Sequence, residues 1–128
     1  MNKILLITSI YFFFHVSYAQ ISIKVENTYN CLAALSSLQG EKISFTDSII
    51  SNAGKFHFNL SSKRSGIYRL LFNSNKWIDF IYDNEEIEIE TDQANILDSL
   101  KIIKSESNKI YYEFIKLNKA YKTKTELL

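Results

Sequence analysis

One stretch of the chain, residues 65–91, alternates apolar and polar side chains over three short segments. The segments cover residues 66–72, 77–82 and 86–90, and polar linkers at 73–76 and 83–85 separate them. A repeat of two with one apolar face is typical of antiparallel strands that cover a core, and the linkers contain residues that favour tight turns. The stretch therefore predicts a β-meander against which the rest of the chain packs.

The residues before the meander repeat this pattern in further short segments. Residues 21–26 alternate, whereas Cys31 to Leu38 is apolar on both faces, which predicts a strand in the middle of the structure. In the next segment we expect Ile43 and Phe45 to face inward, and Phe56, Phe58 and Leu60 line one face of another. The sequence thus predicts an antiparallel β-sandwich or open barrel of about seven short strands.

After Asp92 the period changes. A short helical turn or loop is expected over residues 93–100 and a short extended piece over 101–104, with Ser105 or Ser107 as the N-cap of a helix. The apolar residues Ile110, Phe114, Leu117 and Tyr121 recur at i, i+4, i+7 and i+11, which predicts one amphipathic helix.

These patterns divide the chain into a β-sandwich domain over residues 20–104 and a C-terminal helix over 105–128. No glycine or proline closes the helix, and the sequence ends on two leucines. We therefore interpret the helix as the start of a truncated connector in a longer protein.

The first 19 residues predict a secretory signal peptide. Lys3 supplies a positive start, residues 4–16 are almost wholly apolar, and small residues lead to a cleavage site between Ala19 and Gln20. A membrane anchor is the alternative, but the apolar run is shorter than the ~20 residues that span a bilayer. We expect an exported chain in the periplasm or cell envelope, with no membrane span after cleavage.

The charges are balanced in number but separated along the chain. The sequence has 15 basic and 14 acidic residues, and removal of Lys3 brings the mature chain close to zero net charge, which argues against a nucleic-acid partner. Between residues 77 and 100 every charged side chain is acidic, whereas from Lys101 onward most charged side chains are lysines. Two solvated surfaces are the simplest interpretation. The alternatives are that the two parts attract each other or that the acidic part meets a basic partner.

Few residues are candidates for chemistry. Cys31 is a lone thiol in an oxidising compartment, and its predicted place in a strand that is apolar on both faces favours a buried, inert role over a reactive one. His57 alternates with phenylalanines and is expected to face solvent. One mature histidine supplies neither a catalytic triad nor a metal cluster, so we expect no catalytic residue, cofactor or metal, and hence no enzyme.

The acidic strand offers a possible interaction face made of Glu86, Glu88 and Glu90 together with Trp77. The three glutamates share one solvated side of the predicted strand, where like charges protect a sheet edge. The turn Asp83–Glu86 lacks the spacing of a calcium loop. Aromatic residues at strand positions favour a core over a sugar-stacking platform. That platform would combine Trp77 with Tyr68, Tyr82, Tyr111 and Tyr112.

Three runs carry a resemblance to a known kind of domain: Gly66-Ile-Tyr-Arg-Leu70, Ile78 to Asp92, and Leu97 to Phe114. Together with the order of the upstream segments, which runs from Leu32 through Asp47-Ser48 to residues 54–58, these runs resemble an uncharacterised all-β domain. That domain stands at the N-terminus of exported thioredoxin-like (TlpA/ResA-type) thiol–disulfide oxidoreductases of the Gram-negative envelope. The resemblance implies a helical connector and then a thioredoxin fold with Cys-x-x-Cys. This chain has one cysteine, so the redox activity does not carry over, and no catalytic residue of the family maps onto it.

The resemblance implies a non-catalytic N-terminal domain that docks, dimerises or presents substrates to a redox domain. The alternative is a stand-alone cell-envelope module that binds a glycan or peptide. The expected partners are accordingly another protein or a second copy of the chain. An independent enzyme is the weakest hypothesis, because the sequence offers no nucleophile–base pair or metal set.

Overall fold

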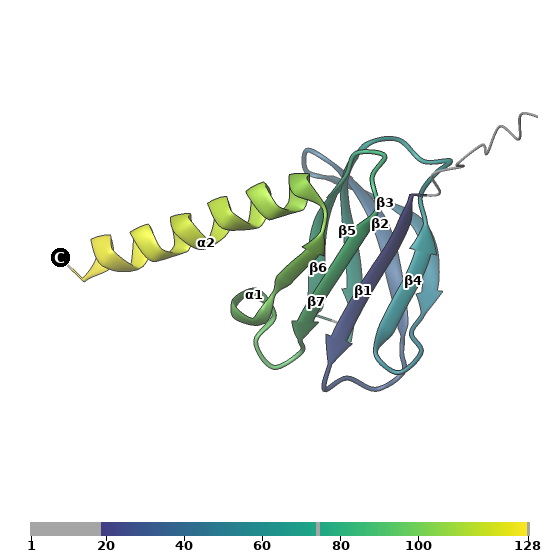
Figure 1. The fold of residues 1–128 in the computed structure, drawn as a ribbon, viewed down its shortest axis with the longest axis horizontal. Helices are drawn as coiled ribbons and strands as arrows, with labels where there is room; N and C mark the ends of the chain where they lie inside the picture. Colours follow the sequence, from purple (N-terminus) through teal and green to yellow (C-terminus); the bar gives the residue numbers. More distant parts are fainter. Residues whose placement is uncertain (1–18, 74, 128) are drawn as a thin grey trace, which may run out of the picture.

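Two four-stranded sheets face each other in the computed structural model, and a long helix extends away from one side of them (Figure 1). The structure describes residues 19–73 and 75–127. Sheet A has the strand order β4-β1-β7-β8 and sheet B the order β3-β2-β5-β6. The predicted mainly-β sandwich with one C-terminal amphipathic helix is confirmed.

Most of the strands alternate between buried and exposed side chains, as the sequence predicts. The loop between β4 and β5 and the turn before β7 are mostly exposed. In chain order the elements are β1 (Gln20–Glu26), β2 (Leu32–Gln39), β3 (Lys42–Ile50), β4 (Lys55–Asn59), β5 (Gly66–Phe72), β6 (Lys76–Tyr82), β7 (Ile87–Asp92), α1 (Ile96–Ser99), β8 (Lys101–Lys104) and α2 (Glu106–Glu126).

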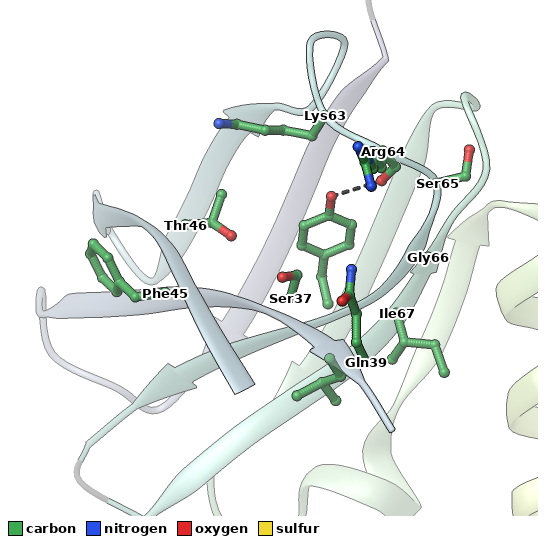
Figure 2. Close-up of a pocket in the computed structure, with 11 residues that line it drawn as sticks. Ser37, Gln39, Phe45, Thr46, Lys63, Arg64, Ser65, Gly66 and Ile67 are labelled. Carbon is green, nitrogen blue, oxygen red and sulfur yellow. Dashed lines mark hydrogen bonds between the residues drawn. The ribbon is translucent and has the colours of Figure 1, made fainter. Parts of the chain in front are cut away.

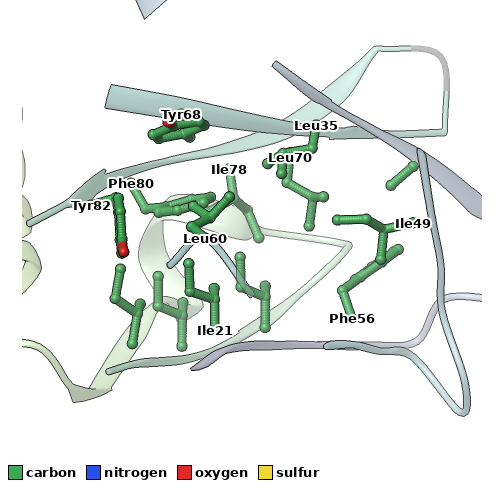
Figure 3. Packing of buried hydrophobic residues seen from close by; sticks show 14 of the residues in the cluster. Ile21, Leu35, Ile49, Phe56, Leu60, Tyr68, Leu70, Ile78, Phe80 and Tyr82 are labelled. Atoms are coloured by element: carbon green, nitrogen blue, oxygen red, sulfur yellow. The ribbon is translucent and has the colours of Figure 1, made fainter. Parts of the chain in front are cut away.

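The core lies between the two sheets and is made of their inward-facing side chains (Figure 3). Ile21 and Ile23 of sheet A and Leu70 and Phe80 of sheet B have no solvent-exposed surface. Each such side chain contributes ~1.5–3 kcal/mol by leaving water, which makes this layer the main source of stability. Phe56 and Phe72 extend the core as an aromatic pair with ring centroids 5.9 Å apart.

The predicted three-stranded meander is wrong in one respect. Strands β5 and β6 form an antiparallel hairpin in sheet B, but β7 crosses to sheet A and pairs in parallel with β1. Ile87 and Ile89 thereby lie beside Ile21 and Ile23 in the core. Alternation says only that a strand buries one face, and both sheets offer an apolar inner side, so the pattern alone does not choose the partner.

Strand β3 also differs from the prediction, because Ile43 and Phe45 are 57% and 68% exposed. The register between β2 and β3 shifts after Leu35, so that Leu35 faces Asp47 but the next residue, Ser36, faces Phe45. Such a bulge moves the following side chains to the other face of the sheet. Ile43 and Phe45 therefore point outward, and Ile49 is the buried hydrophobic residue of this strand.

Helix α2 begins as predicted but packs through a different face. Ser105 is its N-cap and accepts a hydrogen bond from the Asn108 N–H at 3.1 Å. The buried residues are Asn108 and Tyr112, whereas the predicted apolar positions 110, 114, 117 and 121 are exposed. Among the described residues no helix, α2 included, combines the length and the apolar character that crossing a bilayer requires.

The start of α2 completes the hydrogen bonding of β6, the edge strand of sheet B. The Asn108 side chain accepts from the Ile81 N–H at 2.7 Å and donates to the Ile81 carbonyl at 2.8 Å. One amide group thus pairs with β6 as a neighbouring strand would. The Tyr112 hydroxyl donates to the carbonyl of Asp79, which precedes Ile81 by two residues in β6. These bonds fix α2 to the sandwich.

Candidate functional site

The outer side of sheet B carries a broad group of exposed hydrophobic side chains, which we call the apolar sheet face. Its members come from all four strands of the sheet and are between 39% and 75% exposed. A gathering of exposed hydrophobic side chains on one face of a sheet makes that face a candidate interaction site. The exposed members are Leu32, Ile43, Phe45, Ile50, Ile67 and Trp77.

An ion pair lies within this face. Arg69 and Asp79 are direct neighbours across β5 and β6, and the guanidinium donates twice to the carboxylate, at 2.7 and 2.9 Å. The Arg69 guanidinium also lies 4.7 Å from the centre of the Trp77 ring, within the range of a cation–π contact. The hydrogen bond to Asp79 raises the pKa of Arg69. The pair balances its own charge, so the face presents a fixed arginine without net charge.

A hollow of about 270 Å³ lies beside this face, below the loop between β4 and β5 (Figure 2). Ser37 and Thr46 line it from the strands, and Lys63 and Arg64 from the loop. The Tyr68 hydroxyl donates to the Arg64 carbonyl at 2.7 Å, which ties the loop to the sandwich. Within the described part of the chain every buried side-chain N or O atom has a hydrogen-bond partner.

The predicted interaction face does not form as one surface. Trp77 is on the outer side of sheet B, whereas Glu88 and Glu90 belong to sheet A and Glu86 directly precedes its strand β7. Glu88 and Glu90 are half-buried on β7, which lies between β1 and β8. The expectation that the glutamates protect a sheet edge is therefore wrong. Lysines neighbour them instead: Lys104 is opposite Glu88, and Lys24 and Lys101 flank Glu90.

Two ion pairs join the acidic stretch to the later lysines, the arrangement that the sequence offered as an alternative to two separate solvated surfaces. Lys104 lies 3.2 Å from Glu86, and Lys119 of α2 lies 3.2 Å from Asp98. The hydrogen bond from Lys119 lowers the pKa of Asp98. All four side chains are more than half exposed, so each pair contributes little to stability.

Cys31 precedes β2 rather than lying inside it and is half-buried, which corrects the predicted strand position. Its N–H donates to the Ser51 hydroxyl at 2.9 Å, and its carbonyl accepts from the Ser51 N–H at 3.0 Å. His57 is exposed on the edge strand β4, as predicted. The part of the chain that the structure describes contains no cluster of three His, Cys, Asp or Glu residues arranged to hold a metal ion.

The acidic turn before β7 has a structural role. Glu85 accepts a hydrogen bond from the Ser105 hydroxyl at 2.6 Å and from the Ser107 N–H at 3.4 Å, so it stabilises the first turn of α2. The tyrosines considered for sugar stacking are mostly in the core. Tyr68, Tyr82 and Tyr112 are buried, which leaves Trp77 without them as neighbours on the surface.

Sequence reasoning found Trp77 but missed Arg69, Asp79 and the exposed end of β3. One signal was present: Arg69 and Asp79 occupy the polar position of two adjacent segments whose other outward residues are mostly apolar. Strands that are apolar on both faces indicate either a central position or an exposed apolar surface. The register shift in β3 has no comparable signature in the sequence.

Comparison with curated proteins gave no match, and comparison with solved structures gave none either. A family model does match, over residues 19–119. The matched segment contains all eight described strands and continues into α2. The match covers well over half of the chain, which therefore belongs to the family described as a domain of unknown function, DUF4369.

Proposed function

We propose that the chain is an exported, non-catalytic domain that docks a thioredoxin-like disulfide oxidoreductase domain on its apolar sheet face. The alternating strands supply a rigid platform, and the partner supplies the Cys-x-x-Cys chemistry. In this role the domain positions or presents the redox partner and forms no covalent intermediate of its own.

The observation that carries the proposal is the composition of the apolar sheet face. Aromatic residues and arginine are enriched where protein interfaces gain most of their binding energy. Trp77 and Arg69 supply this combination on the paired strands β6 and β5, and Phe45 adds a second aromatic ring on β3, on the far side of β2. Arg69 is held by Asp79 and Trp77, so little side-chain entropy is lost when a partner covers it.

The choice of partner comes from the resemblance of residues 66–70, 78–92 and 97–114 to the N-terminal domain of exported thioredoxin-like oxidoreductases. The predicted signal peptide, with cleavage between Ala19 and Gln20, supports the same compartment. Ala19 is buried in the sandwich and its carbonyl accepts from the Leu60 N–H at 3.5 Å, so cleavage after Ala19 would remove a core contact. The rest of the predicted signal peptide, residues 1–18, lies outside the described residues.

Binding to purified thioredoxin-like domains exported by the same cell tests the proposal. Phe45→Glu places a charge on the apolar sheet face at an already exposed position, so the fold is retained. We expect it to weaken binding at least ~10-fold, the effect of losing an interface anchor. Phe114→Glu is the matched control, because Phe114 is exposed to a similar degree but lies on α2. It should leave the affinity unchanged.

Three results would overturn the proposal. One is the absence of binding to any of these domains, and another is an equal loss of affinity in both variants. The third is reduction of a disulfide substrate by the purified chain alone, since that would make the domain an enzyme. Binding of a glycan or peptide in place of the redox domain would favour the stand-alone binding module.

A further inference from the structure

Helix α2 carries a second exposed apolar surface, separate from the apolar sheet face. It consists of Ile110, Phe114, Leu117 and Tyr121, which are between 61% and 71% exposed and which we call the α2 seam. Leu117 follows Asn108 by about two and a half turns at ~3.6 residues a turn, so the seam lies on the side of the helix opposite its contact with the sandwich. Because α2 extends away from the body, a partner has room along it (Figure 1).

The spacing of the α2 seam is that of a coiled coil. Its members are separated by four, three and four residues, which is the a/d pattern of heptads and gives a narrow stripe. The flanking positions carry little charge: Tyr111, Glu113, Asn118 and Ala120 border the two central residues. A helix that packs on the seam therefore meets no row of like charges.

Four of the five lysines of α2 lie off the seam, and two of these four contact the body of the domain. Lys116 donates to the Leu100 carbonyl at 2.9 Å, and Lys119 donates to Asp98 at 3.2 Å. These contacts hold the opposite side of the helix against the domain. The seam is consequently the side of α2 that is left for another helix.

We propose that the α2 seam pairs with the α2 seam of a second copy of this chain, and that the two helices run antiparallel. The first half of α2 has two glutamates and one lysine, whereas the second half has four lysines and one glutamate. An antiparallel pair puts the acidic half opposite the basic half. A parallel pair puts Lys124, which continues the heptad pattern of the seam, opposite its own copy.

In the antiparallel register Phe114 packs on Leu117 of the second copy, and Ile110 packs on Tyr121. Lys124 then meets Ser107, which ends the seam with a polar layer. Two of the four seam residues are aromatic, and at ~150–250 Å² for a fully buried aromatic side chain the partly exposed seam offers less than the ~800 Å² that each partner buries in a standard interface, as suits a reversible monomer–dimer equilibrium. The inference does not depend on the proposed docking of a redox domain.

Sedimentation equilibrium of the purified exported chain tests the pairing. We expect a monomer–dimer equilibrium, and Phe114→Glu should raise the dissociation constant of the dimer about 100-fold, since it places a carboxylate in the centre of the seam. Phe45→Glu is the control, and it should leave the equilibrium unchanged. A chain that stays monomeric at all concentrations would disprove the pairing. An equal weakening of the dimer in Phe114→Glu and Phe45→Glu would also disprove it.

Disulfide trapping tests the direction of the helices in a Cys31→Ser background. The double variant Ile110→Cys/Tyr121→Cys should form covalent dimers, because the two positions meet across the antiparallel pair. Ile110→Cys alone should form none. Covalent dimers from the single variant would mean a parallel pair and would overturn the proposed direction.

Discussion

At the scale of single residues, Gly54 is the position with the least freedom to change. It lies in the turn between β3 and β4 with φ of +76°, and its carbonyl accepts from the Val25 N–H at 2.8 Å. A Cβ added there would lie 2.4 Å from the carbonyl oxygen of Val25. Glycine is therefore required both by the backbone conformation and by the close approach of a second strand.

Gly54→Ala should lower the free energy of unfolding by more than ~2 kcal/mol. The left-handed conformation alone costs ~1–2 kcal/mol for a residue with a Cβ, and the clash with Val25 adds to it. Gly40→Ala is the control, because Gly40 has φ of +61° and no atom within 4 Å of its added Cβ. Chemical denaturation of the two variants should show a clearly smaller loss at Gly40. Similar losses would mean that the contact with Val25 is unimportant.

At the scale of elements, the alternation predicted the strands and most of their faces. Leu70 and Phe72 of β5, and Ile78 and Phe80 of β6, are buried as expected. This works because a strand gives each side chain one of two directions, and the apolar set identifies the core side. The crossing of β7 to sheet A and the register shift in β3 depend on long-range pairing, which a local pattern does not encode.

The face of α2 that packs was not predictable from hydrophobicity. The helix is held by hydrogen bonds from Asn108 and Tyr112 to the edge of β6, and asparagine counts as a polar residue in any apolar pattern. The apolar residues at 110, 114, 117 and 121 stay outside. Polar side chains that complete a sheet edge are recognised only after the edge itself is known.

Asn108→Ala should lower the free energy of unfolding by about 2–4 kcal/mol, because it leaves both the N–H and the carbonyl of Ile81 without their partner. Asn118→Ala is the matched control on the exposed side of the same helix, and its effect should stay within ~0.5 kcal/mol. Thermal or chemical unfolding measures both. A neutral Asn108→Ala would show that water replaces the side chain at the edge of β6.

At the scale of the whole molecule, the candidate surfaces are on different sides of one rigid sandwich. The apolar sheet face belongs to sheet B. Glu88 and Glu90, with lysines on the neighbouring strands, belong to sheet A, and the α2 seam belongs to a helix that extends from the β6 edge. Trp77 was identified from the sequence, but the other members of its face, Arg69 on β5 and Phe45 on β3, share that face only through the pairing of the four strands. A site built by strand pairing is visible only once the register is known.

Buried tyrosines make the stability of the molecule sensitive to alkali. Tyr68 and Tyr82 lie in the core, their ring centroids 6.1 Å apart, and Tyr112 joins α2 to β6. Burial raises the pKa of all three above the ordinary value of 10.0, most strongly at Tyr112. The folded state thus favours the neutral phenol. The stability that the buried tyrosines contribute is therefore fully present at pH values below the ordinary tyrosine pKa of 10.0.

As the pH rises above about 10, tyrosines of the unfolded chain release protons that the folded chain retains, so the free energy of unfolding should fall. Tyrosinate absorbance and circular dichroism should therefore change together in an alkaline titration. Tyr112→Phe removes the tyrosine whose pKa is raised most and should therefore raise the pH at the midpoint of alkaline unfolding. Tyr29→Phe, at a side chain that is 91% exposed, should leave this midpoint unchanged. Ionisation of the buried tyrosines well before loss of structure would contradict this, because it would mean that the folded state accepts the phenolate without cost.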